Sequence, residues 1–228
     1  MKRNLITSLL FLWTVTCFAQ KDLSGTYSYA FKPEGNPPKE AVDAGRSGKL
    51  VLLKIDDNKY RFWLDVGAGW PSYILGETDG TLSFVNDTAS FDNTFEGASN
   101  PCILKFRYNE GTIIINGFST SYDCGFGNGV NADGDYAWLK KQPALNYQWL
   151  RKEYPEAPTI VITNDKAELF RDESLLYPFT PGQYCSKGES MLGIIQTEKA
   201  VYTEYFSSSG KFIYGWLKKS AVKFGKPE

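Results

Sequence analysis

The chain has 228 residues, a formal net charge of −1 and no histidine. A charge this close to zero, without a basic tract, excludes the electrostatic footprint of a nucleic-acid-binding protein. The lack of histidine removes Ser-His-Asp and Cys-His nucleophiles and the usual catalytic zinc sites. We therefore expect a protein that is not an enzyme and holds no metal or other cofactor.

The N-terminus has the order of residues found in a secretory signal peptide. Lys2 and Arg3 precede an apolar run, and Ala19 follows as the small residue expected before a cleavage site. The run is too short to span a bilayer, which takes about 20 residues. The sequence thus predicts a signal peptide over 1–19, a periplasmic or secreted protein and no transmembrane segment. Lipidation of Cys17 is the less favoured alternative, because Thr16 stands where lipoprotein signals usually carry a smaller residue.

Residues 20–141 show the pattern of an antiparallel barrel. In the segment 102–108, Leu104 and Phe106 share one face while Lys105 and Arg107 share the other, so one side faces a core and one faces water. Turn residues separate this segment from its neighbours. The predicted strands are 25–31, 48–55, 59–66, 80–85, 102–108, 111–117 and a closing strand at 135–139.

Two connections in this half lack a strand pattern. The segment 31–48 contains three prolines and is expected to be disordered or to cover one mouth of the barrel. The segment 66–73 carries Trp70 between a glycine and a proline, followed by Tyr73. These two aromatic residues are candidate ligand contacts, since an exposed tryptophan marks a binding spot. The alternative is that Trp70 plugs the barrel.

The glycine-rich segment 124–136 could hold calcium or phosphate, or could be a turn. Gly129 and Lys140 stand where an EF-hand needs ligands, and neither a phosphate-loop lysine nor a following helix is present. We interpret the segment as a turn-rich connection anchored by a disulfide from Cys124 to Cys102 in the same half. Cys185 is then a buried or partly buried free thiol, which without histidine lacks an activating base.

A change in pattern marks the second half. A proline-led segment with Leu145 and Trp149 four residues apart predicts a helix at about 143–153, within a linker over 142–157. Short strand patterns return over 158–228. The expected fold is all-β, with two barrels joined by a short helix.

Both halves resemble known families. The residues Leu23–Tyr29, together with the pattern from Cys102 to Tyr136, resemble lipocalin-like (calycin) barrels of small exported bacterial proteins, some of them grouped with lysozyme inhibitors. The turn 187–189, the strand 200–206 and the residues 215–217 resemble bacterial Src-homology-3-type domains. The second resemblance implies that Trp216 belongs to the core and that the module binds wall peptides or docks beside another domain.

The leading hypothesis is a non-catalytic binding protein of the bacterial cell envelope, which recognises cell-wall peptide or a protein partner. The alternative is inhibition of a lysozyme-type enzyme by the loop 67–73. A third hypothesis, an enzyme using paired carboxylates such as Asp133 and Asp135, is weaker because turns explain the pairs. The candidate groove residues of the second half are Tyr177, Tyr184, Tyr202 and Tyr205.

Overall fold

The structure is a computed structural model, and it describes residues 21–32, 35–41, 45–93, 101–117 and 123–225. The predicted signal peptide and Cys17 lie outside these residues. Within the described ranges no helix is long and apolar enough to cross a membrane.

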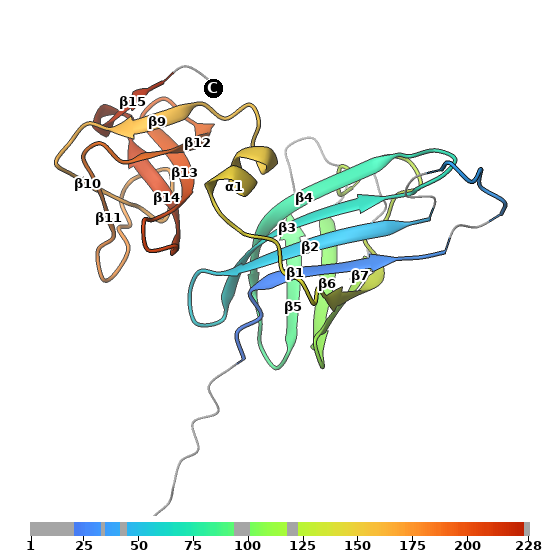
Figure 1. The fold of residues 1–228 in the computed structure, drawn as a ribbon. Helices are drawn as coiled ribbons and strands as arrows, with labels where there is room; N and C mark the ends of the chain where they lie inside the picture. The colour runs from blue at the N-terminus through green and yellow to red at the C-terminus, as the bar shows by residue number, and fades with distance from the viewer. Residues whose placement is uncertain (1–20, 33–34, 42–44, 94–100, 118–122, 226–228) are drawn as a thin grey trace, which may run out of the picture.

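The first half forms a near-closed antiparallel sheet of eight strands in the order β4-β3-β2-β1-β8-β7-β6-β5 (Figure 1). Strands β4 and β5 are its two edges, and they approach each other without pairing along a ladder. The strands are β1 (Gly25–Ala30), β2 (Ser47–Lys54), β3 (Lys59–Gly67), β4 (Leu75–Ser83), β5 (Thr88–Asn93), β6 (Cys102–Asn109), β7 (Thr112–Gly117) and β8 (Gly134–Trp138).

Side chains fill the interior of this sheet. Alternate residues such as Leu104 and Phe106 of β6 point inward and are about 1% exposed. Edge-to-face aromatic pairs, including Tyr60 with Phe84 and Phe62 with Phe91, pack across the centre. An eight-stranded barrel is just wide enough for side chains to fill it. The buried side chains of the described strands therefore form a packed core.

The disulfide between Cys102 and Cys124 is present. Its Cα atoms are 4.6 Å apart, and it ties the start of β6 to the segment that leads into β8. In that segment Asp133 accepts a hydrogen bond from the backbone N–H of Gly117 with an N–O distance of 2.5 Å. Strand β8 begins at the next residue, as expected for a turn-rich connection.

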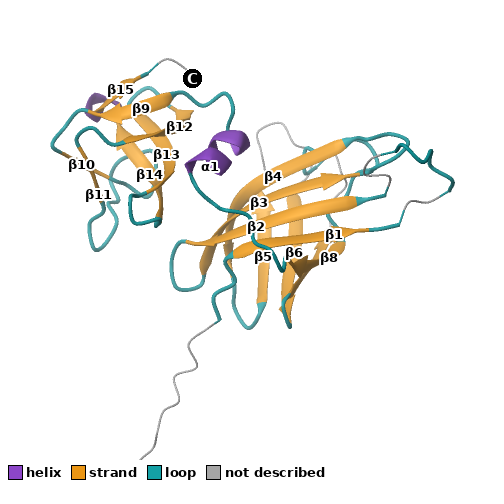
Figure 2. Ribbon diagram, viewed as in Figure 1, coloured by secondary structure: helices purple, strands orange, loops and turns teal. Residues whose placement is uncertain are grey.

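The connecting helix is shorter than predicted. Helix α1 (Tyr147–Glu153) starts at an Asn146 N-cap, whose side chain accepts a hydrogen bond from the backbone N–H of Trp149 (Figure 2). Asparagine is among the residues that best satisfy the free N–H groups at a helix start. The helix therefore begins at this cap and not at Pro143.

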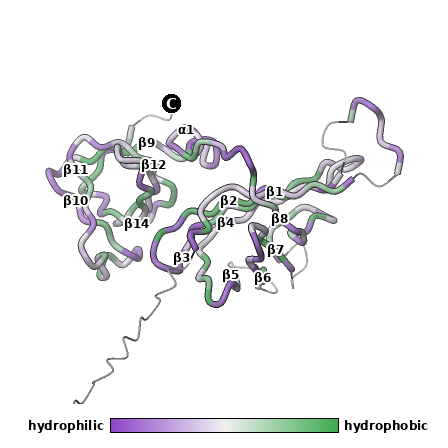
Figure 3. Tube along the Cα trace, turned by 60° about the horizontal axis from the view of Figure 1, so that its bottom comes forward, coloured by the Kyte–Doolittle hydropathy of each residue, from purple (hydrophilic) through white to green (hydrophobic). Residues whose placement is uncertain are grey.

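The second half forms a five-stranded antiparallel sheet, in the order β14-β13-β12-β9-β15, and a separate hairpin of β10 and β11. Hydrophobic segments follow the strands of both halves, and many connections are hydrophilic (Figure 3). The strands are β9 (Thr159–Ile162), β10 (Lys166–Glu168), β11 (Tyr184–Ser186), β12 (Ser190–Gln196), β13 (Ala200–Phe206), β14 (Phe212–Lys218) and β15 (Val222–Phe224), with a 3-10 turn at Lys219–Ala221.

Two strands have little sequence signal. In β5 only Ala89 and Phe91 are buried, because this edge strand contacts the core with one face and has ladder partners on one side. Strand β11 is three residues long, and only its central Cys185 is buried. Strand β11 is shorter than the four alternating residues that predict a strand, and the alternation of β5 covers only 88–91.

Candidate binding surfaces

The two sheets share a hydrophobic core on the outer face of β2 and β3. Trp63 of β3 is 4% exposed although its neighbours Phe62 and Leu64 point into the barrel. Its ring contacts Trp149 of α1 at 4.9 Å and Phe212 of β14 at 5.8 Å between centroids. We call this cluster the shared core; its buried members are Val51, Leu53, Trp63, Leu150, Ala157, Leu192 and Phe212.

A buried polar network lies beside the shared core. Arg61 of β3 donates from Nε to Oε1 of Glu204 on β13 at 2.5 Å and from Nη2 to Asp79 of β4. The hydroxyl of Tyr154 accepts hydrogen bonds from Arg61 and from the Trp63 indole, at 2.9 Å each. Glu204 is fully buried, and its Oε2 atom has no hydrogen-bond partner among the described residues.

Charge and burial determine the pKa values in this network. Burial alone would lower the pKa of Arg61, but the negative charge of Glu204 raises it well above its usual value. The pKa of Tyr202 is raised by burial and by the charge of Glu204, to which its hydroxyl donates at 2.8 Å. The cation therefore persists in the interface and the phenol stays protonated.

Two tyrosines predicted to line a groove lie elsewhere. Tyr205 is 5% exposed in the core of the second half, and its hydroxyl contacts the Cys185 sulfur at 3.4 Å. Tyr202 is half-buried on the opposite face of β13, next to Glu204. The reason is alternation along β13, which directs Val201, Thr203 and Tyr205 to the core and the residues between them to the first sheet.

Trp216 was also expected in that core, and it is not there. It pairs with Tyr202 across β13 and β14, with ring centroids 5.5 Å apart, and it is half-buried. Its neighbour Leu217 is the fully buried residue at this end of β14. The aromatic face of β13 and β14 is therefore used mainly to pack the two halves together.

The other two predicted tyrosines are exposed, in and beside the connection between β10 and β11. Tyr177 is 62% exposed and Tyr184 is 43% exposed, and Leu176 next to them is 71% exposed. The ammonium group of Lys166 lies 3.6 Å from the centroid of the Tyr184 ring. A cation at this distance over an aromatic face is held by the ring quadrupole, so Tyr184 and Lys166 form one surface unit.

A groove of about 170 Å³ adjoins this unit. Buried Phe170 forms part of its floor, and isolated bridges connect Phe170 to Pro178 and to Trp216. Lys166 and Lys218 line it, and neither ammonium group has a carboxylate within 4.0 Å among the described residues. We call this site the lysine groove; its lining residues are Asn164, Lys166, Ala167, Glu168, Phe170, Lys218 and Ala221.

The candidate loop of the first half projects from one end of the barrel (Figure 1). Tyr73 at its C-terminal end is 47% exposed and has a positive φ of 50°, and its backbone N–H donates to the carbonyl of Gly69 at 2.7 Å. Trp70 is half-buried, so it is neither a buried plug nor a fully exposed contact. This loop and the lysine groove belong to different halves, and the structure does not bring them together.

Cys185 is buried at the centre of β11 and is not in a disulfide. Burial raises the pKa of its thiol to about 11. A thiol that is protonated at neutral pH is a poor nucleophile.

The signal for the shared core was present in the sequence but was not recognised. The runs 50–53 and 62–64 are apolar on both faces, a pattern typical of strands that are covered on both sides. The sequence contains no comparable pattern for the lysine groove, because its residues come from two separate segments, 164–170 and 218–221.

No family model matches the chain, and comparison with curated proteins and with solved structures finds no significant match.

Proposed function

We propose that the protein is an exported, non-catalytic binding protein of the bacterial cell envelope, and that its lysine groove binds a short acidic peptide of the cell wall. The single observation that carries this proposal is the pair Lys166 and Lys218, which flank an aromatic floor without carboxylate partners of their own. The resemblance of this half to Src-homology-3-type domains supports the same reading, as does the disulfide, which suits an oxidising compartment.

The size of the groove defines what can enter it. Small-molecule sites usually measure about 300–1,000 Å³, whereas the lysine groove measures about 170 Å³. It therefore accommodates one carboxylate-bearing unit of a peptide, with the rest of the peptide passing over Tyr184 and Tyr177. Such a small contact gives weak binding of the single peptide.

The test is co-sedimentation of the full chain with purified peptidoglycan. We expect Lys166→Gln with Lys218→Gln to weaken retention about tenfold, as expected for losing charged hydrogen bonds. Lys199→Gln, an exposed position in the turn between β12 and β13, is the matched control. A synthetic wall stem peptide should compete for binding, and its carboxamide form should not. Retention on peptidoglycan that the double substitution leaves unchanged would refute the proposal.

A second candidate function rests on Tyr73 and Leu75, which are 47% and 68% exposed at the end of the barrel. This loop could enter the cleft of a lysozyme-type enzyme and inhibit it. A lysozyme activity assay with the full chain and with Tyr73→Ala decides the question. Inhibition that Tyr73→Ala abolishes would favour this function over wall binding.

A further inference from the structure

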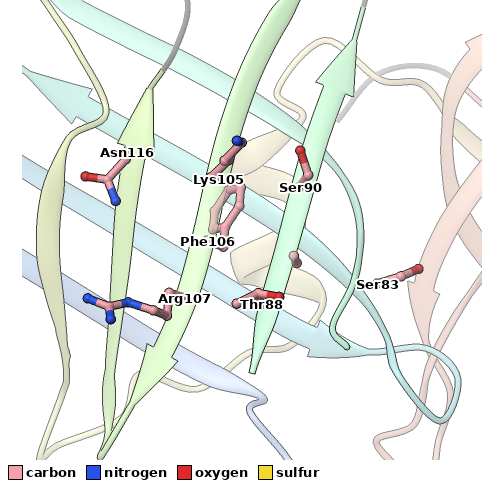
Figure 4. Close-up of a pocket in the computed structure, with 8 residues that line it drawn as sticks. Ser83, Thr88, Ser90, Lys105, Phe106, Arg107 and Asn116 are labelled. Carbon is pink, nitrogen blue, oxygen red and sulfur yellow. The ribbon is translucent and has the colours of Figure 1, made fainter. Parts of the chain in front are cut away.

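An open hollow of about 430 Å³ lies where the eight-stranded sheet is not closed. Ser83 at the end of β4 and the residues 88–90 of β5 belong to the two edge strands, and all of them line the hollow. Buried Ala89 and Phe106 also contribute to it, so it reaches between the strands toward the core. We call this site the seam hollow (Figure 4).

Strand register explains why the surface is hollow here. Thr88 and Ser90 on the outer face of β5 pair with Arg107 and Lys105 of β6, and Lys105 pairs in turn with Asn116 of β7. The short side chains of β5 therefore lie next to the long side chains of β6 and β7, which form one wall of the hollow. Figure 4 shows Lys105 and Arg107 on the strand next to β5, and Asn116 on the strand beyond it.

The lining is cationic and hydroxyl-rich, and it contains no carboxylate. The eight residues are Ser83, Thr88, Ala89, Ser90, Lys105, Phe106, Arg107 and Asn116. The Arg107 side chain forms no ion pair or hydrogen bond within the described part of the chain, and it is exposed. The hydroxyl of Thr88 donates to the carbonyl of Val85, so it is left to act as an acceptor.

We propose that the seam hollow binds an anionic saccharide. A guanidinium group presents a planar fork that binds carboxylate or phosphate through two hydrogen bonds. Ser90 and Asn116 add hydroxyl and amide groups that both donate and accept, as sugar hydroxyls require. From β5 to β7 the lining crosses two strand spacings, about 10 Å, which gives room for more than one sugar ring.

The apolar part of the lining disfavours a peptide in this position. Peptide recognition on sheets gains specificity from pockets that receive side chains. Here Phe106 is 1% exposed and Ala89 is 8% exposed, so neither residue forms an open apolar pocket for a peptide side chain. A ligand with an anionic group for Arg107 and hydroxyl groups for Ser90 and Asn116 fits these side chains better.

The test compares ligands of one length that differ in charge. A hyaluronan tetrasaccharide carries carboxylates, fully N-acetylated chitotetraose (called chitotetraose below) is its neutral counterpart, and tetraglutamate represents an acidic peptide. Binding to the full chain is measured by calorimetry and ligand-observed NMR at low salt. All proteins compared carry Lys166→Gln and Lys218→Gln, so binding at the lysine groove does not contribute and failure at the seam hollow is distinguishable from failure at the lysine groove.

We expect the hyaluronan tetrasaccharide to bind and chitotetraose to bind at least about tenfold more weakly, the range of one charged hydrogen-bonded contact. Arg107→Gln should weaken hyaluronan binding by a similar factor without lowering the melting temperature, because the side chain is exposed. Lys54→Gln, an exposed position at the end of β2, is the control and should change nothing.

Three results would overturn the proposal. Equal binding of the neutral tetrasaccharide would remove the role of charge. Binding that is unaffected by Arg107→Gln would place the ligand elsewhere. Tighter binding of tetraglutamate would show that the hollow is a peptide site.

Discussion

Arg61 and Glu204, 143 residues apart in the sequence, form a buried ion pair that links β3 of the first sheet to β13 of the second. The Glu204 side chain is 0% exposed and that of Arg61 is 9% exposed. Removing one charge from such a pair leaves the other without compensation, whereas replacing both with apolar residues is often neutral. Single and double substitutions of this pair are therefore expected to differ in their effect on the free energy of unfolding.

We expect Arg61→Met to lower the free energy of unfolding by about 3–5 kcal/mol. The double substitution Arg61→Met with Glu204→Leu should recover most of the loss. Lys49→Met is the control: its ammonium group pairs with Asp65 and with Glu153, but the Lys49 side chain is 42% exposed, and an exposed pair contributes about 0–1 kcal/mol. Denaturant titration measures all three. A cost for Arg61→Met no larger than that for Lys49→Met would contradict the interpretation of this network.

The fragments 20–141 and 158–228 are each expected to give strand-rich circular dichroism, but to unfold at a lower temperature than the full chain. Separation exposes the shared core, including Trp63 on one side and Phe212 on the other. It also removes α1, whose buried Leu150 covers this cluster. Binding of a hydrophobic dye should increase for both fragments. Fragments as stable as the full chain would show that the shared core contributes nothing to stability.

Replacing Cys102 and Cys124 together with alanine should lower the free energy of unfolding by about 3 kcal/mol, the chain-entropy value for a loop of this size. The bond encloses a sequence separation of 22 residues. Peptide mapping without reduction should recover this single crosslink and no crosslink to Cys185. A Cys185 crosslink would contradict the assigned pairing.

The thiol of Cys185 should react slowly with a thiol reagent at pH 8 in the folded protein and rapidly once it is unfolded. Burial raises its pKa from 9.0 to about 11. The folded state therefore holds the proton more tightly, so this stabilisation is complete below about pH 9 and is lost as the pH rises toward about 11. Denaturant titrations across this pH range should show a steeper fall for the native chain than for Cys185→Ala. Equal slopes would contradict the assignment.

Tyr205→Ala should destabilise the protein by about 3–5 kcal/mol, the range for truncating a buried aromatic residue. Tyr184→Ala should change the stability little, because Tyr184 is 43% exposed, but it should weaken retention on peptidoglycan. Thermal unfolding and co-sedimentation measured on the same samples separate the two effects. A loss of binding for Tyr205→Ala without a loss of stability would mean that the faces of β13 are assigned the wrong way round.

The predictability of this fold from sequence depended on whether a strand has one buried face or two. Alternation of Lys105 and Arg107 with Leu104 and Phe106 predicted β6 correctly, because one of its faces meets solvent. The same rule could not assign the faces of β13, since Tyr202 and Tyr205 are both at least half-buried, one by each neighbour. The lysine groove and the seam hollow depend on which strands become neighbours in a sheet. The local sequence pattern does not specify that pairing.

The shared core also fixes the span between the two proposed ligand sites, because it joins their sheets through packed rings and not through a flexible tether. Two sites on a flexible linker accommodate many ligand spacings, whereas rigid sites gain avidity only when a polymer presents its groups at one matching distance. A protein built in this way selects ligands that present their two groups at that distance. It would distinguish wall polymers by the interval between sugar and peptide units, even where each unit alone binds weakly.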